Sequence, residues 1–198
     1  MSENERKTEP EETAVLIIDM QRDFVEPGAP LEVKGAADTV PVIARFLEFA
    51  RKKRWRIIHI VRRHKADGSD ADMPRRYLFT IGKGYCVENT SGEEIVSVIK
   101  EQPGDIKIIK RRFSGFHDTA LDATLRGLGV RRVYVTGTQY PNCIRATAVD
   151  AMSLDYDTIV VTDCCSAATP EIACSNIRDM QAMGIRCENS QDIKSQYQ

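Results

Sequence analysis

The stretch RVYVTGTQYPNCIRATAVDA, residues 132–151, decides the fold because it runs from a strand through a short turn into a helix. Its first part is apolar almost throughout rather than alternating, which is typical of a parallel strand covered on both faces. The turn GTQYPN follows, and residues 142–154 have a helical pattern. Strand, turn and helix in this order predict a right-handed βαβ unit of a parallel sheet.

The same pattern recurs along the rest of the chain. Five further strand-like runs, the last of them weak, begin at residues 14, 56, 106, 157 and 185. Helical segments lie at 39–54, 119–128, 142–154 and 170–183. Thr169 is the expected N-cap of the last one, with Pro170 at its first helical position. We therefore predict a Rossmann-like α/β fold of three layers (αβα), with an open, six-stranded, mostly parallel sheet.

Composition places the chain among ordinary globular proteins. Its 198 residues fit one domain, and a formal net charge of -1 calls for neither nucleic acid nor an anionic membrane as a partner. We expect a disordered N-terminal lead over residues 1–11, a single domain over 12–190 and a C-terminal tail over 191–198. Six cysteines without a CxxC pair, and a polar N-terminus without a signal peptide, favour reduced thiols and a cytoplasmic location.

One segment breaks the alternation of strands and helices. Residues 64–90 are polar and contain glycines, with little helical or strand period. A loop of this length in a compact domain is usually functional or disordered. Its expected position beyond the carboxyl end of a strand makes it a candidate cover for an active site.

Three reactive residues follow strands. Asp19 ends the first strand, Lys110 ends the third, and Cys143 follows the fourth and opens a helix. Because ligands bind at the carboxyl ends of strands in such sheets, we expect the three to converge. Each has an ordinary alternative: a turn aspartate, a solvated lysine or a small buried cysteine. For Cys143, however, a helix N-terminus would stabilise the thiolate.

Three motifs carry a family resemblance. IIDMQRDF (residues 17–24), KRRFSGFHDTALDATLRGLG (110–129) and VTGTQYPNCIRATAVDA (135–151) resemble those of the isochorismatase-like cysteine hydrolase superfamily. The resemblance spans about residues 12 to 188 and implies the isochorismatase-like hydrolase fold. It also implies that Asp19, Lys110 and Cys143 are catalytic and that no cofactor is needed.

The resemblance extends to further site residues. It implies an oxyanion hole formed by the backbone amides of Gln139 and Cys143, with a cis peptide bond before Gln139. Phe24 matches a position that commonly walls the substrate pocket, although a core phenylalanine is the alternative. Tyr140 could line the pocket or pack against the sheet.

The sequence departs from the nicotinamidase branch of this superfamily at its metal site. That branch carries a metal-binding Asp-x-His motif after the second strand, whereas this chain reads VRRH, which puts Arg62 in place of the carboxylate. The three histidines, His59, His64 and His117, make a poor ligand set. We therefore expect no metal. The chain resembles N-carbamoylsarcosine amidase and ureidoacrylate amidohydrolase more than nicotinamidase.

These features predict a hydrolase that cleaves a small carboxamide, carbamoyl or ureido compound through a cysteinyl thioester. Asp19 would take the thiol proton, Lys110 would hold the carboxylate, and the thiolate would attack the carbonyl carbon. Relatives form homodimers or homotetramers, so we expect the same here. Two alternatives stay open: an isochorismatase-type vinyl-ether hydrolase in which Cys143 is incidental, and a non-catalytic binding module of the same fold.

Overall fold

The computed structural model describes residues 12–197, and the predicted N-terminal lead, residues 1–11, lies outside this range. Within it one sheet has the strand order β3-β2-β1-β4-β5-β6, and every neighbouring pair is parallel. The strands are β1 (Thr13–Ile18), β2 (Arg56–Arg62), β3 (Ile106–Lys110), β4 (Arg132–Thr138), β5 (Asp157–Ser166) and β6 (Arg186–Glu188). The predicted six-stranded sheet is confirmed, and it is parallel throughout.

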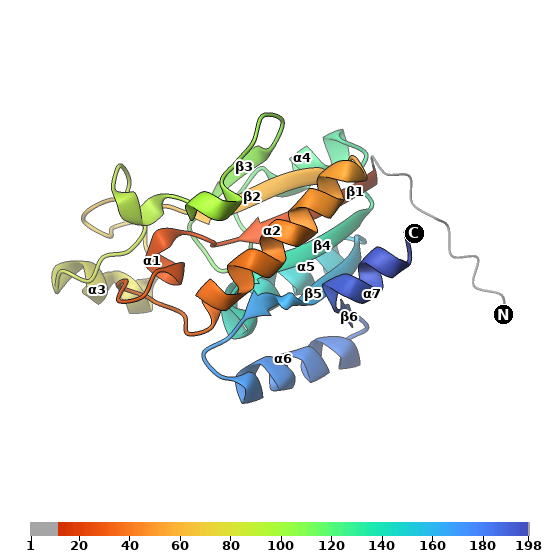
Figure 1. The fold of residues 1–198 in the computed structure, drawn as a ribbon. Coiled ribbons are helices and arrows are strands. Elements are labelled where there is room, and N and C mark those ends of the chain that lie inside the picture. The colour runs from red at the N-terminus through yellow and green to blue at the C-terminus, as the bar shows by residue number, and fades with distance from the viewer. Residues whose placement is uncertain (1–11, 198) are drawn as a thin grey trace.

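Helices cover both faces of the sheet, which confirms the predicted three layers (Figure 1). The described helices are α1 (Arg22–Val25), α2 (Ala36–Lys52), α3 (Arg76–Thr80), α4 (Leu121–Gly127), α5 (Arg145–Ser153), α6 (Pro170–Ala182) and α7 (Ser190–Ser195). Buried side chains of α2 and α7 form one apolar core with the sheet, and those of α4, α5 and α6 form the other. The hydroxyl of Thr169 accepts a hydrogen bond from the amide of Ile172, as expected of the N-cap of α6.

Two short helices lie where the sequence shows no helical period. The segment 64–90 contains the 3-10 turn η2 (Met73–Arg75) and α3, which stands away from the sheet and buries none of its residues (Figure 1). The predicted C-terminal tail contains most of α7, and Ile193 on that helix is fully buried. A single buried apolar residue produces no apolar stripe in a sequence, so only the packing reveals α7.

The strand order reverses between β1 and β4, and this reversal positions the candidate site. In open parallel sheets, ligands bind outside the carboxyl ends of the strands at such a point. The two strands approach closely at Gly137, whose φ is +112°. A Cβ atom there would collide with the backbone of Ile18, so only glycine fits.

No helix among residues 12–197 is long and apolar enough to span a membrane.

Candidate active site

Side chains from three segments meet at the carboxyl edge of the sheet. The Nζ atom of Lys110 lies 2.7 Å from Oδ2 of Asp19 and 3.3 Å from Sγ of Cys143. The same ammonium group donates to the backbone carbonyls of Arg112 and Phe113, each at 3.1 Å. All three reactive side chains are buried. The structure thus brings together the three residues that the sequence singled out.

Asp19 is held in an unusual backbone conformation directly after β1. Its φ is +53°, in the left-handed region that aspartate tolerates better than most residues. The amide of Asp19 donates to the carbonyl of Ile60 on β2, which fixes the turn. Oδ2 is bound to Lys110, whereas Oδ1 is buried without a hydrogen-bond partner among the described residues. A carboxylate in this state has one oxygen free to accept a proton.

Cys143 lies in the π-helical turn η5 (Tyr140–Ile144), which runs directly into α5. Its carbonyl accepts a hydrogen bond from Oγ1 of Thr147 at 2.7 Å, and that hydroxyl in turn accepts a hydrogen bond from the amide of Gly115 at 2.9 Å. The peptide bond between Thr138 and Gln139, just before this turn, is cis. Thr147 therefore ties the turn that carries Cys143 to the loop after β3.

Electrostatics at the thiol differ from the sequence-based expectation. Burial raises the pKa of Cys143, the carboxylate of Asp19 raises it further, and the cations Lys110 and Arg62 oppose both. The thiolate stabilisation that we expected from a helix N-terminus does not prevail because the thiol is only 6% exposed and faces a carboxylate. A raised pKa favours the protonated thiol, so formation of a thiolate here calls for a base.

A fourth charged group, Arg62, reaches the thiol from the end of β2. Its Nη2 atom lies 3.7 Å from Sγ of Cys143, and its Nη1 atom lies 2.8 Å from Oδ2 of Asp72. Burial lowers the pKa of Arg62, but its electrostatic interactions with the acidic groups of Cys143, Asp19, Tyr85 and Asp72 outweigh burial and raise that pKa. The family resemblance indicates that Arg62 stands in place of a metal-binding carboxylate but not that it contacts Cys143.

The residues at this position do not fit a divalent metal ion. Arg62 places a buried cation where the nicotinamidase motif has a carboxylate, and a second cation beside it would be repelled. His64 is fully buried, and burial together with the charge of Arg62 lowers its pKa to about 4. Residues 12–197 contain no group of three or more His, Cys, Asp or Glu side chains arranged to hold a metal.

The two residues predicted to bind substrate are packed into the cores. The Tyr140 side chain is 1% exposed, and its hydroxyl donates to the carbonyl of Thr162 on β5 at 3.0 Å. This favours the packing alternative for Tyr140, because its hydroxyl is already used by the sheet. Phe24 is 6% exposed and lies 5.9 Å from the ring of Tyr85, which favours the core alternative for it as well.

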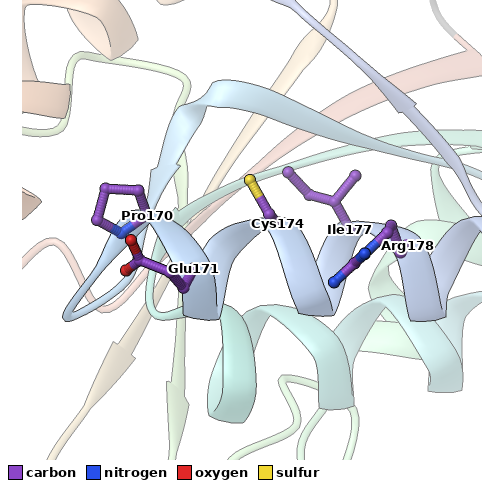
Figure 2. Close-up of a pocket in the computed structure, with 5 residues that line it drawn as sticks. All are labelled: Pro170, Glu171, Cys174, Ile177 and Arg178. Carbon is purple, nitrogen blue, oxygen red and sulfur yellow. The ribbon is translucent and has the colours of Figure 1, made fainter.

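A surface hollow elsewhere does not belong to this cluster. It lies along α6 and is lined by Pro170, Glu171, Cys174, Ile177 and Arg178 (Figure 2). None of the charged or nucleophilic residues described above lines it.

Fold and site together define an α/β protein with a buried Asp-Lys-Cys cluster at the switch point of a parallel sheet. The sequence model of the isochorismatase domain family matches residues 13–192, and the chain therefore belongs to the isochorismatase family. The crystal structure of an isochorismatase family protein from Desulfovibrio vulgaris superposes with a TM-score of 0.91 at 54% identity, covering 93% of this chain and 97% of that one.

Two curated relatives have names that refer to amide hydrolysis, one of them as an activity that is absent. The probable inactive nicotinamidase of Arabidopsis thaliana is 42% identical and covers 88% of this chain and 90% of its own length. The ureidoacrylate amidohydrolase RutB of Caulobacter segnis is 29% identical over 82% of this chain and 76% of its own length. The family thus includes amidohydrolases, alongside a relative whose name describes it as inactive.

Proposed function

We propose that this protein is a cysteine-dependent hydrolase that cleaves a small carboxamide, carbamoyl or ureido compound through a thioester. The observation that carries the proposal is the position of Lys110, whose ammonium lies within hydrogen-bond distance of both the Asp19 carboxylate and the Cys143 sulfur. A base and a nucleophile held by one buried cation form the arrangement that activates a thiol.

The reaction would use each group in turn. Oδ1 of Asp19 takes the proton of Cys143, and the sulfur attacks the carbonyl carbon. Asp19 then gives the proton to the departing nitrogen as the C–N bond breaks, which leaves a thioester. A water molecule, deprotonated by Asp19, adds to the thioester. The C–S bond then breaks, and the sulfur leaves as a thiolate that takes the proton back from Asp19. The backbone amides of Gln139 and Cys143 are the proposed donors to the oxyanion.

An ammonia-release screen over small amides, carbamoyl compounds and ureides tests the proposal. We expect turnover of at least one compound by the wild type and none by Cys143→Ala. Cys174→Ser is the matched control because Cys174 is exposed on α6 and outside the site. A covalent adduct whose mass equals the acyl group, trapped on Cys143 by acid quench, would identify the thioester.

The non-catalytic alternative has one observation in its favour, the relative from Arabidopsis thaliana whose name describes it as inactive. A binding module would retain the amide in equilibrium dialysis yet release no ammonia and form no adduct. Activity that survives Cys143→Ala would instead favour the vinyl-ether hydrolase.

We also propose that the protein is a homodimer or homotetramer. Three apolar side chains of the η2–α3 segment are strongly exposed: Met73 at 80%, Tyr77 at 60% and Ile81 at 57%. Three strongly exposed apolar residues within one nine-residue segment support the proposal that this segment contacts another subunit. Light scattering should show an oligomer for the wild type and a monomer for Tyr77→Ser/Ile81→Ser if this segment forms the interface.

A further inference from the structure

The guanidinium of Arg62 is held against the nucleophile by several independent contacts. The side chain is 1% exposed, and Nη1 donates to Oδ2 of Asp72 at 2.8 Å. Nη2 donates to the carbonyl of Arg112 at 2.8 Å, and the ring of Phe113 lies 5.5 Å from the guanidinium carbon. Because these contacts fix the group, its remaining contact with Sγ of Cys143 at 3.7 Å is a feature of the site rather than a passing approach.

The buried charges balance only when Arg62 is included. With Cys143 as a thiol, the carboxylates of Asp19 and Asp72 are matched by the cations of Lys110 and Arg62. Moving the thiol proton to Asp19 preserves this balance and leaves the sulfur anion facing two cations. Without Arg62 the cluster would carry an excess negative charge, and in a buried site that charge would oppose formation of the thiolate.

We propose, building on the function proposed above, that Arg62 is a fourth catalytic residue whose Nη2–H hydrogen bond stabilises the thiolate of Cys143. When the S–H bond breaks, the proton passes to Asp19 and the electron pair stays on sulfur beside Arg62. When water has added to the thioester and the C–S bond breaks, the electron pair returns to sulfur beside the same guanidinium. Arg62 thus acts at the start and at the end of the cycle.

The rate at which iodoacetamide alkylates Cys143 as a function of pH tests this role in the full-length protein, with peptide mass spectrometry as the readout. The groups that face the thiol are Asp19, Lys110 and Arg62. The groups around Arg62 on its other sides are Asp72, Tyr85 and His64, and Arg112 lies 3.8 Å from Asp72. We expect Arg62→Gln to move the midpoint of the pH profile upward by about one unit. At pH 7 this is roughly a tenfold slower alkylation.

Two further variants separate catalysis from packing. Asp72→Asn keeps the guanidinium but removes its counter-charge, so we expect the midpoint to move downward, opposite to Arg62→Gln. Arg63→Gln is the matched control, because Arg63 is the next residue along, pairs with Glu93 and has a partly exposed side chain. A purely structural role for Arg62 would not produce shifts of opposite sign.

A profile for folded Arg62→Gln that superposes on that of the wild type would overturn the proposal. If Arg62→Gln does not fold, the Asp72→Asn profile decides, and an unchanged or raised midpoint there would overturn it as well. Alkylation needs no substrate, so the result is independent of the amide screen. Shifts of the expected sign with no ammonia release would support stabilisation of the thiolate by Arg62 and refute only the amidase function.

Discussion

Replacing Lys110 by methionine tests the ion pair on which the candidate site depends. The Lys110 and Asp19 side chains are 0% and 2% exposed, and their charged atoms lie 2.7 Å apart. Removing one partner of a buried pair costs about 3–5 kcal/mol because the other charge stays buried and uncompensated. The carbonyls of Arg112 and Phe113 also lose a donor, at about 1 kcal/mol each. We expect Lys110→Met to lower the free energy of unfolding by about 5–7 kcal/mol.

Urea unfolding at pH 7 measures this loss, with the fluorescence of Trp55, the one tryptophan of the chain, as the probe. Trp55 is buried and stacks on Tyr134 at 4.8 Å, so its signal follows the core. Asp19→Asn completes a double-mutant cycle, since asparagine tolerates the positive φ of this position. The stability loss of the double variant should be smaller than the sum of the two single losses by at least about 2 kcal/mol. Additive losses, or a loss below about 1 kcal/mol for Lys110→Met, would refute the reasoning.

Three further outcomes follow from the structure. Gly137→Ala should cost more than about 3 kcal/mol in urea unfolding, because its Cβ would collide with the Ile18 backbone, whereas Gly127→Ala, with open space around it, should be neutral or slightly stabilising. Thr169→Ala should cost about 1 kcal/mol through the lost cap of α6, and Thr169→Ser should retain most of it. His64 has a folded pKa of about 4, below its ordinary value near 6.5, so the unfolded chain binds its proton first. Stability should therefore fall by up to about 3 kcal/mol as the pH drops from 6.5 to 4, and His64→Leu should lack this part of the loss.

Most of the fold could be predicted because its strands are covered on both faces. Such strands are apolar throughout, so each appears in the sequence as a continuous β-branched run, and the helices between them carry one-sided apolar stripes. Elements without that signal were missed. Helix α3 buries nothing, and Ile193 is the one buried apolar residue of α7, so neither produces a period.

The sequence motif at Arg62 and Arg63 does not decide which of the two side chains turns toward the candidate site. Both follow the apolar run of β2, and as sequence neighbours they look equivalent. Successive residues of a strand point to opposite faces, and the pairing of β2 with β1 and β3 decides which one turns toward the site. Arg62 is thereby buried against Cys143, whereas Arg63 stays partly exposed and pairs with Glu93.

The sequence by itself determined the parallel αβα architecture and the meeting of Asp19, Lys110 and Cys143, because the carboxyl ends of parallel strands lie at one edge of a sheet. Only the tertiary structure decided how those groups are charged and which neighbours they have. Burial raises the pKa of the thiol against the expectation from its helix terminus, Tyr140 gives its hydroxyl to the sheet, and Arg62 adds a second cation. Desolvation and the pairing of charges depend on distances in space, and these do not follow from spacing along the chain.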